Sequence, residues 1–186
     1  MDVEMKKYTL EDLENFEIDE YSGYKICPTG DYTGIRRFPG CCIFGRQCSF
    51  GERCSFGRWS RFGEECIFGR WISFGERCSF GERCSFGRQC SFGEWSSFGE
   101  RCSFDKQCKV ENNKEIKEMI KFEGFGSTHR CTYFFKLTDG RIYVRCGCFA
   151  GYIDEFREQV KETHGDNKFA KEYEAVADLA EMHFGD

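Results

Sequence analysis

A phenylalanine stands at every sixth position through the middle of the chain. The twelve positions are Phe38, Phe44, Phe50, Phe56, Phe62, Phe68, Phe74, Phe80, Phe86, Phe92, Phe98 and Phe104. Ile26 and Tyr32 continue the spacing upstream and Val110 continues it downstream, so the repetitive body runs over about residues 24–111. A short period kept over this length predicts a solenoid, in which each repeat packs on its neighbours.

From Phe44 onward, the residue two positions before each phenylalanine, and before Val110, is small or apolar. It is cysteine at Cys42, Cys48, Cys54, Cys66, Cys78, Cys84, Cys90, Cys102 and Cys108, and otherwise Ser60, Ser96 or Ile72. Because residues i and i+2 share one face of a strand, both positions should line a core, while the residue between them, usually serine, faces solvent. Glycine follows phenylalanine from Gly45 to Gly99, where we expect a sharp corner that needs a residue without a Cβ.

This Cys-Ser-Phe-Gly-Glu/Arg-x unit resembles the hexapeptide repeat of left-handed parallel β-helix proteins. The resemblance covers about residues 24–111 and implies three hexapeptides in each triangular coil and about five stacked coils. The family has Leu, Ile or Val where this chain has Phe, so a four-sided coil is the alternative, and a disordered Phe-Gly segment is the alternative to folding. The predicted fold class is mainly β: a left-handed, three-sided parallel β-helix solenoid with a small α+β C-terminal module.

The two ends of the chain depart from the repeat. Residues 1–23 are predicted to form an N-terminal cap with a short helix from Leu10 to Phe16, begun by a capping box of Thr9 and Asp12. Residues 112–186 are predicted to form the α+β module, a β-hairpin followed by two helices.

The hairpin should turn at Asp139-Gly140. A two-residue loop there would place Tyr133, Phe135 and Leu137 on the same face as Ile142, Val144 and Cys146. The helices that would cover this face are expected over residues 152–163 and 168–183.

Charge is distributed unevenly along the chain. The net charge is −5, made up of −6 over residues 1–34, +5 over residues 35–110 and −4 over residues 111–186. This division favours a local anion-facing surface in the middle over a polybasic tail. No stretch of about 18 apolar residues and no signal peptide is present, so the chain is expected in the cytoplasm, without a membrane partner.

The fourteen cysteines invite disulfide and metal interpretations. Without an export signal a reducing compartment is expected. Stacking every third hexapeptide puts Ser60, Ile72 and Ser96 into the same inward columns as the cysteines, so we expect reduced thiols acting as small hydrophobic groups. In the C-terminal part, Cys131, Cys146 and Cys148 with His129 and His164 give a zinc alternative, but their spacing is not that of a zinc ribbon. We therefore predict no metal and no other cofactor.

The same stacking sorts the outward polar positions into three edges. On the first edge, Trp59, Arg77 and Trp95 fall into one column, which predicts an aromatic and cationic binding surface. A ladder that only stabilises the solenoid is the alternative. On the third edge, a cationic column beside a tryptophan would suit phosphate or an acidic protein. Its residues are Arg70, Arg88 and Lys106, with Trp71 next to them. The second edge is expected to be a solvated salt-bridge ladder.

A second resemblance concerns about residues 120–186. Phe122-Glu-Gly-Phe-Gly-Ser, Tyr133-Phe-Phe, Arg145-Cys-Gly-Cys-Phe and Thr163-His-Gly-Asp-Asn look like a C-terminal module attached to uncharacterised repeat proteins of phages and mobile elements in gut-type bacteria. The resemblance implies a bacterial host cell and brings no known activity.

We predict a non-enzymatic protein that binds a macromolecule, preferably a protein. The most specific form of this hypothesis is an inhibitor of a host enzyme or of an antiviral defence complex. Hexapeptide β-helices also include acyltransferases and carbonic anhydrases, but their histidines come from the coils or the loops of the coils, whereas His129, His164 and His183 all lie in the C-terminal module. Nucleic-acid binding along the cationic edge is the main alternative, disfavoured by the net charge. Ice binding is disfavoured by charged columns on every edge. The oligomeric state is left open.

Overall fold

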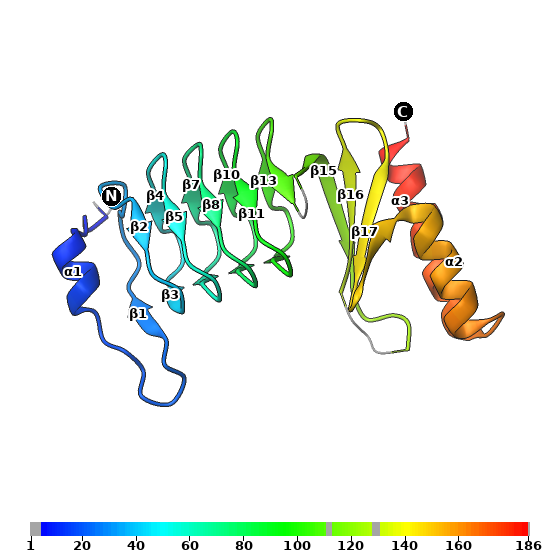
Figure 1. Ribbon diagram of the computed structural model, residues 1–186, viewed down its shortest axis with the longest axis horizontal. Helices are drawn as coiled ribbons and strands as arrows, with labels where there is room; N and C mark the ends of the chain where they lie inside the picture. The colour runs from blue at the N-terminus through cyan, green and yellow to red at the C-terminus, as the bar shows by residue number, and fades with distance from the viewer. Residues whose placement is uncertain (1–4, 111–112, 128–130, 186) are drawn as a thin grey trace. The chain divides into compact units, whose positions relative to one another are not determined.

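The computed structural model describes residues 5–110, 113–127 and 131–185 (Figure 1). The chain divides into two compact units, residues 1–115 and residues 116–186. The expected end of the repeat at Glu111 and the zinc candidate His129 lie outside the described residues.

The first unit is a parallel β-solenoid of about five turns, as predicted. Its strands are β1 (Lys25–Cys27), β2 (Arg37–Phe38), β3 (Cys42–Phe44), β4 (Ser49–Phe50), β5 (Ser55–Phe56), β6 (Arg61–Phe62), β7 (Ile67–Phe68), β8 (Ser73–Phe74), β9 (Ser79–Phe80), β10 (Ser85–Phe86), β11 (Ser91–Phe92), β12 (Ser97–Phe98), β13 (Ser103–Phe104) and β14 (Lys109–Val110). Successive strands of a turn enter three different sheets: β1-β3-β6-β9-β12, β4-β7-β10-β13 and β2-β5-β8-β11-β14. Pairing joins each hexapeptide to the third one after it, as in Phe74↔Phe92. Left-handed winding and a triangular cross-section stay predictions.

The core is a stack of phenylalanine rings, as the six-residue period predicted. Within a column the rings lie nearly parallel: Phe74 lies 5.1 Å from Phe56 and 5.1 Å from Phe92, at 9° and 3°. Between columns they meet edge to face, as Phe74 does with Phe80 at 4.8 Å and 83°. Both arrangements are favourable for aromatic quadrupoles, so each ring gains contacts within its own turn and with adjacent turns.

Each hexapeptide is joined to its neighbours by backbone hydrogen bonds. In one repeat, the N–H groups of Ile67 and Gly69 donate to Cys48 and Phe50 of the preceding turn at 2.9 and 3.0 Å. The N–H of Trp71 donates in the opposite direction, to Arg88 of the next turn at 2.9 Å. The corners thus contribute to the ladder, and short strands suffice to hold the turns together.

The glycine that follows phenylalanine is needed where adjacent turns approach closely. The left-handed backbone conformation falls two residues later, at side-chain-bearing positions such as Trp59 and Arg77, with φ of 65° and 56°. A Cβ on Gly75 would instead lie 2.6 Å from the backbone nitrogen of Arg58 in the preceding turn. The expected need for a residue without a Cβ is therefore present, and its cause is the close approach of adjacent turns.

The first turn is capped by α1 (Leu10–Asn15). The capping box is present: the N–H of Thr9 donates to Asp12 Oδ2 at 2.7 Å, and the N–H of Asp12 donates to Thr9 Oγ1 at 3.2 Å. Tyr8 stacks on the buried Tyr32 at 5.0 Å. The aromatic column of the core therefore ends under side chains of the cap.

A loop of residues 17–24, the projecting loop, connects the cap to β1 and extends away from the turns (Figure 1). Its ends are joined by hydrogen bonds from Ile26 N–H to Glu17 O and from Asp19 N–H to Tyr24 O, both 2.8 Å. The loop is therefore held at its base by backbone contacts.

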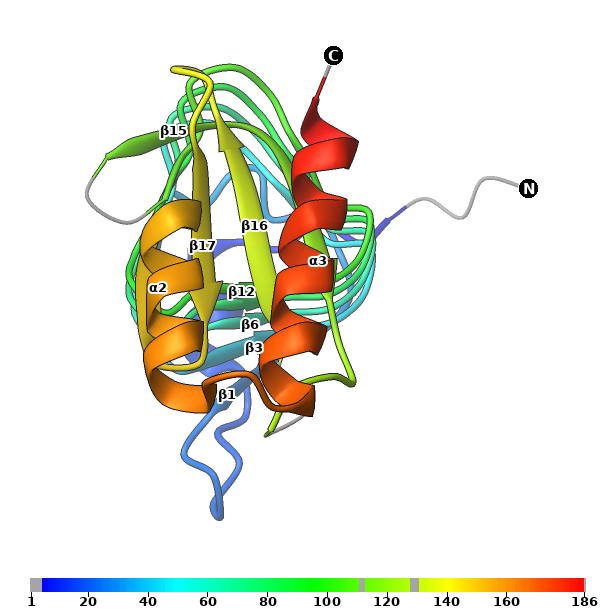
Figure 2. The same ribbon diagram turned by 90° about the vertical axis from the view of Figure 1, so that its right-hand side faces the viewer.

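The second unit contains an antiparallel sheet and two helices. Its elements are β15 (Lys114–Phe122), whose first two residues belong to the first unit and pair with β14, then β16 (Thr132–Leu137), β17 (Ile142–Cys146), β18 (Phe149–Tyr152), α2 (Ile153–His164) and α3 (Lys168–Phe184). Figure 2 shows α2 and α3 side by side over β16 and β17. Phe134, Val144 and Ile142 form a buried core with the helices.

The predicted hairpin register is wrong by one residue. Lys136 pairs with Ile142, and the N–H of Leu137 donates to Arg141 O at 2.9 Å, so the loop holds the three residues 138–140. The third of them, Gly140, has φ of 88°, which glycine adopts without strain. A loop of odd length reverses which face each later residue occupies, so Phe134 rather than Tyr133 faces the helices.

Candidate binding groove

The first edge places two tryptophans and an arginine at the same corner position of three successive turns. Trp59, Arg77 and Trp95 follow one another at intervals of one full turn and share the left-handed backbone conformation. The side chains of Trp59 and Trp95 are 40% and 44% exposed, which is high for large aromatic groups. The outward direction of these side chains follows from the corner, because the phenylalanine and cysteine positions on either side point inward.

These three residues line a shallow groove of about 410 Å³, which we call the tryptophan groove. Its lining residues are Tyr24, Trp59, Arg61, Arg77, Ser79 and Trp95. Arg61 and Ser79 come from the outward positions of β6 and β9, and Tyr24 comes from the end of the projecting loop. The groove thus combines one edge, one strand face and one loop of the same unit.

Two guanidinium groups in the groove each lie over an aromatic ring. Arg77 lies 4.7 Å from the ring centroid of Trp59, and Arg61 lies 4.7 Å from that of Tyr24. Stacking on a ring fixes a guanidinium group and leaves the N–H groups at its rim able to donate to an anion.

The ion pairing of these two arginines differs from that of three other arginines of the solenoid. Arg46, Arg70 and Arg83 each pair with a glutamate of a neighbouring turn, at 2.8, 2.6 and 3.3 Å. Among the described residues, no carboxylate lies within salt-bridge distance of Arg61 or Arg77. Glu76 and Glu94 stand beside Arg77 and Trp95 along the edge but do not line the groove. The groove is therefore locally cationic on a chain of net charge −5.

The third edge is organised differently. Trp71 is 41% exposed, but Arg53 and Arg70 lie over its ring at 5.1 and 4.9 Å, and Arg70 Nε donates to Glu52 at 2.6 Å. These residues form a ladder within the solenoid that uses the ring faces of the tryptophan. Arg88 and Lys106 continue the column in the following turns and are exposed. The structure thus brings Trp59, Arg77 and Trp95 together and places the other four predicted residues on a separate edge.

Three groove residues were not predicted from the sequence: Tyr24, Arg61 and Ser79. Arg61 and Ser79 could have been found, because they stand two residues after Trp59 and Arg77 at outward strand positions. Tyr24 could not, because its place depends on the path of a loop outside the repeat.

All fourteen cysteines are free, and nine of them are buried. Burial raises the pKa of Cys78 to about 11 and also raises the pKa of Cys54. In the second unit a cavity of about 530 Å³ is lined by Cys146, Cys148 and His164 together with aromatic side chains. The described part of the chain holds no group of three or more His, Cys, Asp and Glu side chains placed to bind a metal.

Comparison with protein-family models, with curated proteins and with solved structures finds no match for this chain. No helix among the described residues is both long and apolar enough to cross a membrane. The class of protein is therefore defined by its fold and surface: a parallel β-solenoid with an aromatic, cationic groove on one edge.

Proposed function

We propose that this chain is a non-enzymatic scaffold that binds a partner protein in the tryptophan groove. The observation that carries the proposal is a groove that holds two exposed tryptophans and two ring-stacked arginines, neither of which has a carboxylate partner among the described residues. Trp, Tyr and Arg are the residue types that dominate association energies at protein interfaces. Because the turns hold these side chains in place, little conformational entropy is lost on binding.

The chemistry of the groove favours binding over catalysis. Its described lining includes no histidine, cysteine or carboxylate, so the hydroxyl groups of Tyr24 and Ser79 have no such base beside them in the groove to activate them. Its guanidinium groups are hydrogen-bond donors, and its tryptophans are unreactive toward common substrates. Shape, stacking and charge are what the groove supplies.

The partner that we propose is a protein with an acidic segment beside an apolar side chain. A more specific proposal for the partner is a host enzyme or an antiviral defence complex. This proposal rests only on the resemblance of residues 120–186 to mobile-element proteins. The Glu52–Arg70 ion pair argues against nucleic-acid binding on the third edge, because it already pairs one of the cations of that edge.

The experiment uses the full chain with an affinity tag, expressed in its native cell, and identifies co-purified molecules by mass spectrometry. The test variant is Trp59→Gln with Trp95→Gln, since the repeat already uses glutamine at Gln47 and Gln89. We expect the double variant to stay folded and to weaken binding by about 2 kcal/mol or more.

Trp71→Gln is the matched control, because Trp71 has the same repeat position, the same backbone conformation and a similar exposure. It should bind as the parent chain does. Equal losses in both variants, or unchanged binding by the double variant, would contradict the proposal. If nucleic acid co-purifies with the chain, is removed by nuclease, and no partner protein is retained, the alternative function of nucleic-acid binding would be favoured.

A further inference from the structure

The projecting loop presents apolar side chains to solvent on a defined backbone. Tyr21 is fully exposed and Ile18 is 55% exposed. Beyond the hydrogen bonds at its base, the N–H of Gly23 donates to Asp19 O at 2.8 Å. Ser22 N–H and Oγ–H donate to Asp19 Oδ1 at 2.7 and 2.6 Å, closing the tip. Exposed apolar groups on a preorganised loop are typical of a surface that binds another molecule.

The same loop is acidic. Glu17, Asp19 and Glu20 stand next to Ile18 and Tyr21 in the sequence. The hydrogen bonds from Ser22 hold the pKa of Asp19 below its usual range, so its carboxylate is ionised at neutral pH. The loop therefore offers several negative charges together with a tyrosine and an isoleucine, and these are the features complementary to the tryptophan groove.

We propose that the projecting loop of one copy occupies the tryptophan groove of a second copy, so that the chain forms a symmetric dimer. The proposal rests on the proposed function, because it assigns a partner to the same groove. The carboxylates of the loop would pair with Arg61 and Arg77, and Tyr21 would lie against the open ring of Trp95. No cation among the described residues lies over that ring.

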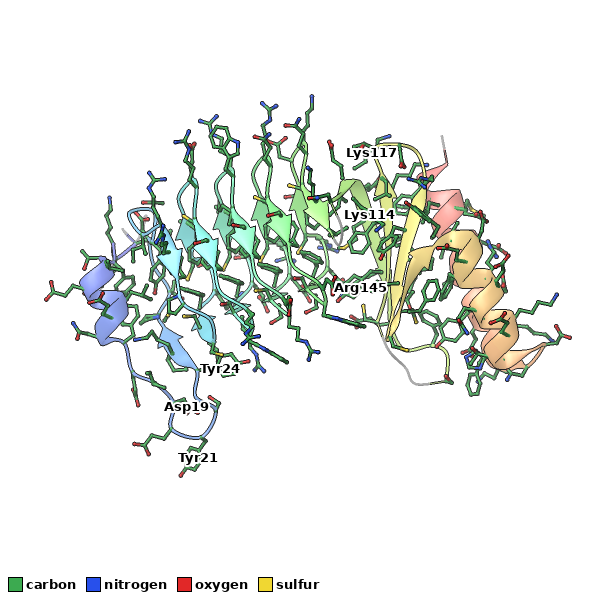
Figure 3. All side chains as sticks on the ribbon, viewed as in Figure 1. Asp19, Tyr21, Tyr24, Lys114, Lys117 and Arg145 are labelled. Atoms are coloured by element: carbon green, nitrogen blue, oxygen red, sulfur yellow. The ribbon has the colours of Figure 1, made fainter. Side chains whose placement is uncertain are left out.

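The loop does not fill the groove of its own chain, because Tyr21 is fully exposed. Figure 3 shows Asp19 and Tyr21 away from the turns, and Tyr24 closer to the solenoid. Since Tyr24 ends the loop and also lines the groove, loop and groove adjoin. A two-fold axis beside Tyr24 would therefore bring both loop-to-groove contacts together and close the assembly at two copies.

The first test measures the molar mass of the full chain in solution as a function of concentration and salt. The mass should rise with concentration from the 21.8 kDa of one chain toward twice that value, and high salt should reduce it. Tyr21→Ser should weaken self-association about thirtyfold. Ile67→Ser, which removes an exposed apolar side chain on β7, should leave self-association unchanged. A parent chain that stays monomeric at all concentrations, or equal effects of the two variants, would overturn the proposal.

The second test exchanges charges between loop and groove. One variant carries Glu17→Lys and Glu20→Lys, and the other carries Arg61→Glu and Arg77→Glu. Each variant alone should be monomeric, because in a dimer of two identical copies the loop and the groove would carry charges of the same sign. Their mixture should form a dimer, because each loop then meets a groove of opposite charge. A mixture that stays monomeric although both variants melt like the parent chain would overturn the proposal.

These outcomes separate the proposal from the proposed function. If the parent chain is monomeric, and a foreign protein co-purifies with it but not with the Trp59 and Trp95 variant, the groove binds that protein and the proposed dimer is wrong. If the mixture of the charge-exchanged variants dimerises, but the Trp59 and Trp95 variant still binds every foreign protein that the parent chain binds, the dimer is supported and the proposal of a foreign partner in the groove is wrong.

Discussion

At the scale of single residues, the inward cysteines are hydrogen-bond donors as well as apolar groups. The Sγ of Cys78 donates to Gly57 O of the preceding turn at 3.5 Å, and Cys84 and Cys90 make the same contact with Gly63 and Gly69. Ser60 and Ser96, in the same column as Cys78, donate instead to the glycine three residues before them, at 2.9 and 2.7 Å. The position therefore accepts a thiol, a hydroxyl or, at Ile72, an apolar side chain, and its polar occupants donate to a backbone carbonyl.

The pH dependence of stability tests this interpretation. Because burial raises the pKa of Cys78 to about 11 from an ordinary value of 9.0, the folded state favours the protonated thiol. The stabilisation is complete below pH 9 and is lost as pH rises toward 11, at roughly 1.4 kcal/mol per pH unit for one such thiol. Cys78→Ser should unfold at a urea concentration similar to that of the parent near neutral pH and lose less stability near pH 11. Equal losses of stability by the parent chain and by Cys78→Ser near pH 11 would contradict a buried, protonated thiol at Cys78.

Thiol reactivity in the native protein should fall into two classes. Cys148 is exposed and Cys41, Cys102, Cys131 and Cys146 are partly exposed, whereas the other nine cysteines are buried. A thiol reagent added to the reduced, folded chain should therefore label at most five sites quickly, and the rest only at the rate of unfolding. Rapid labelling of most of the fourteen would contradict a solenoid with inward thiols.

The ring stack makes the effect of truncation depend on position. Phe74 is buried and stacks on Phe56 and Phe92, so Phe74→Ala should lower the free energy of unfolding by about 3–5 kcal/mol. Phe104 is partly exposed and stacks in its column on Phe86, so Phe104→Ala should lower it less. Denaturant unfolding of both variants measures the difference. Equal, near-zero losses would indicate that the rings do not form a common core.

At the scale of the repeat unit, each corner combines two requirements at two different positions. Gly87 lies where a Cβ would be 2.8 Å from the backbone of Gly69, whereas Gln89 has the left-handed conformation with φ of 60°. The sequence satisfies the first requirement with glycine and leaves the second to side-chain-bearing residues, which adopt this conformation at some energetic cost.

This division predicts opposite effects of two changes in one corner. Gly87→Ala should lower the free energy of unfolding by about 1–3 kcal/mol, because the added methyl group meets the backbone of the preceding turn. Gln89→Gly should raise it by up to about 1 kcal/mol, because glycine relieves the left-handed conformation. Thermal and urea unfolding of both variants check the signs. Destabilisation by Gln89→Gly equal to that of Gly87→Ala would contradict the assignment.

The same corner shows what the sequence could and could not predict. The spacing of the phenylalanines, and of cysteines such as Cys84, was enough to predict the inward positions and the edges, since both follow from counting. The reason for Gly87 was not accessible, because it depends on how closely two turns approach. The hairpin register failed for a related reason: whether its loop holds two or three residues decides the face of Val144, and Asp139-Gly140 fits either length. Tyr24 joined the groove only through the path of the projecting loop.

At the scale of the whole solenoid, the inside and the outside follow different periods. The inward pattern repeats with every hexapeptide, so any corner is compatible with any of the three columns. The outward edges repeat only with every third hexapeptide, because a residue lies beside the one a full turn away. A shift by one hexapeptide therefore preserves the core but moves every later side chain to another edge.

A variant of unchanged composition exploits this difference. Moving the hexapeptide 85–90 to the position after Cys102 puts Trp95 at the place now held by Gln89, on the third edge, and leaves the residues from Ser103 onward in place. The variant should melt within a few degrees of the parent chain, and it should lose binding in the tryptophan groove as the Trp59 and Trp95 variant does. An unfolded product would show that the three columns are not interchangeable. Unchanged binding would show that Trp95 is not part of the site.

The pairing of every third hexapeptide also has a consequence for the gene. Because the neighbouring hexapeptides Ser73–Cys78 and Ser79–Cys84 are identical, unequal recombination between such repeats can add or remove whole hexapeptides. A gain or loss of three hexapeptides preserves both the core and the edge that each side chain occupies. A gain or loss of one preserves the core alone and gives every downstream residue of the solenoid a new edge. Such a gene can generate new recognition surfaces in single steps without first losing the fold.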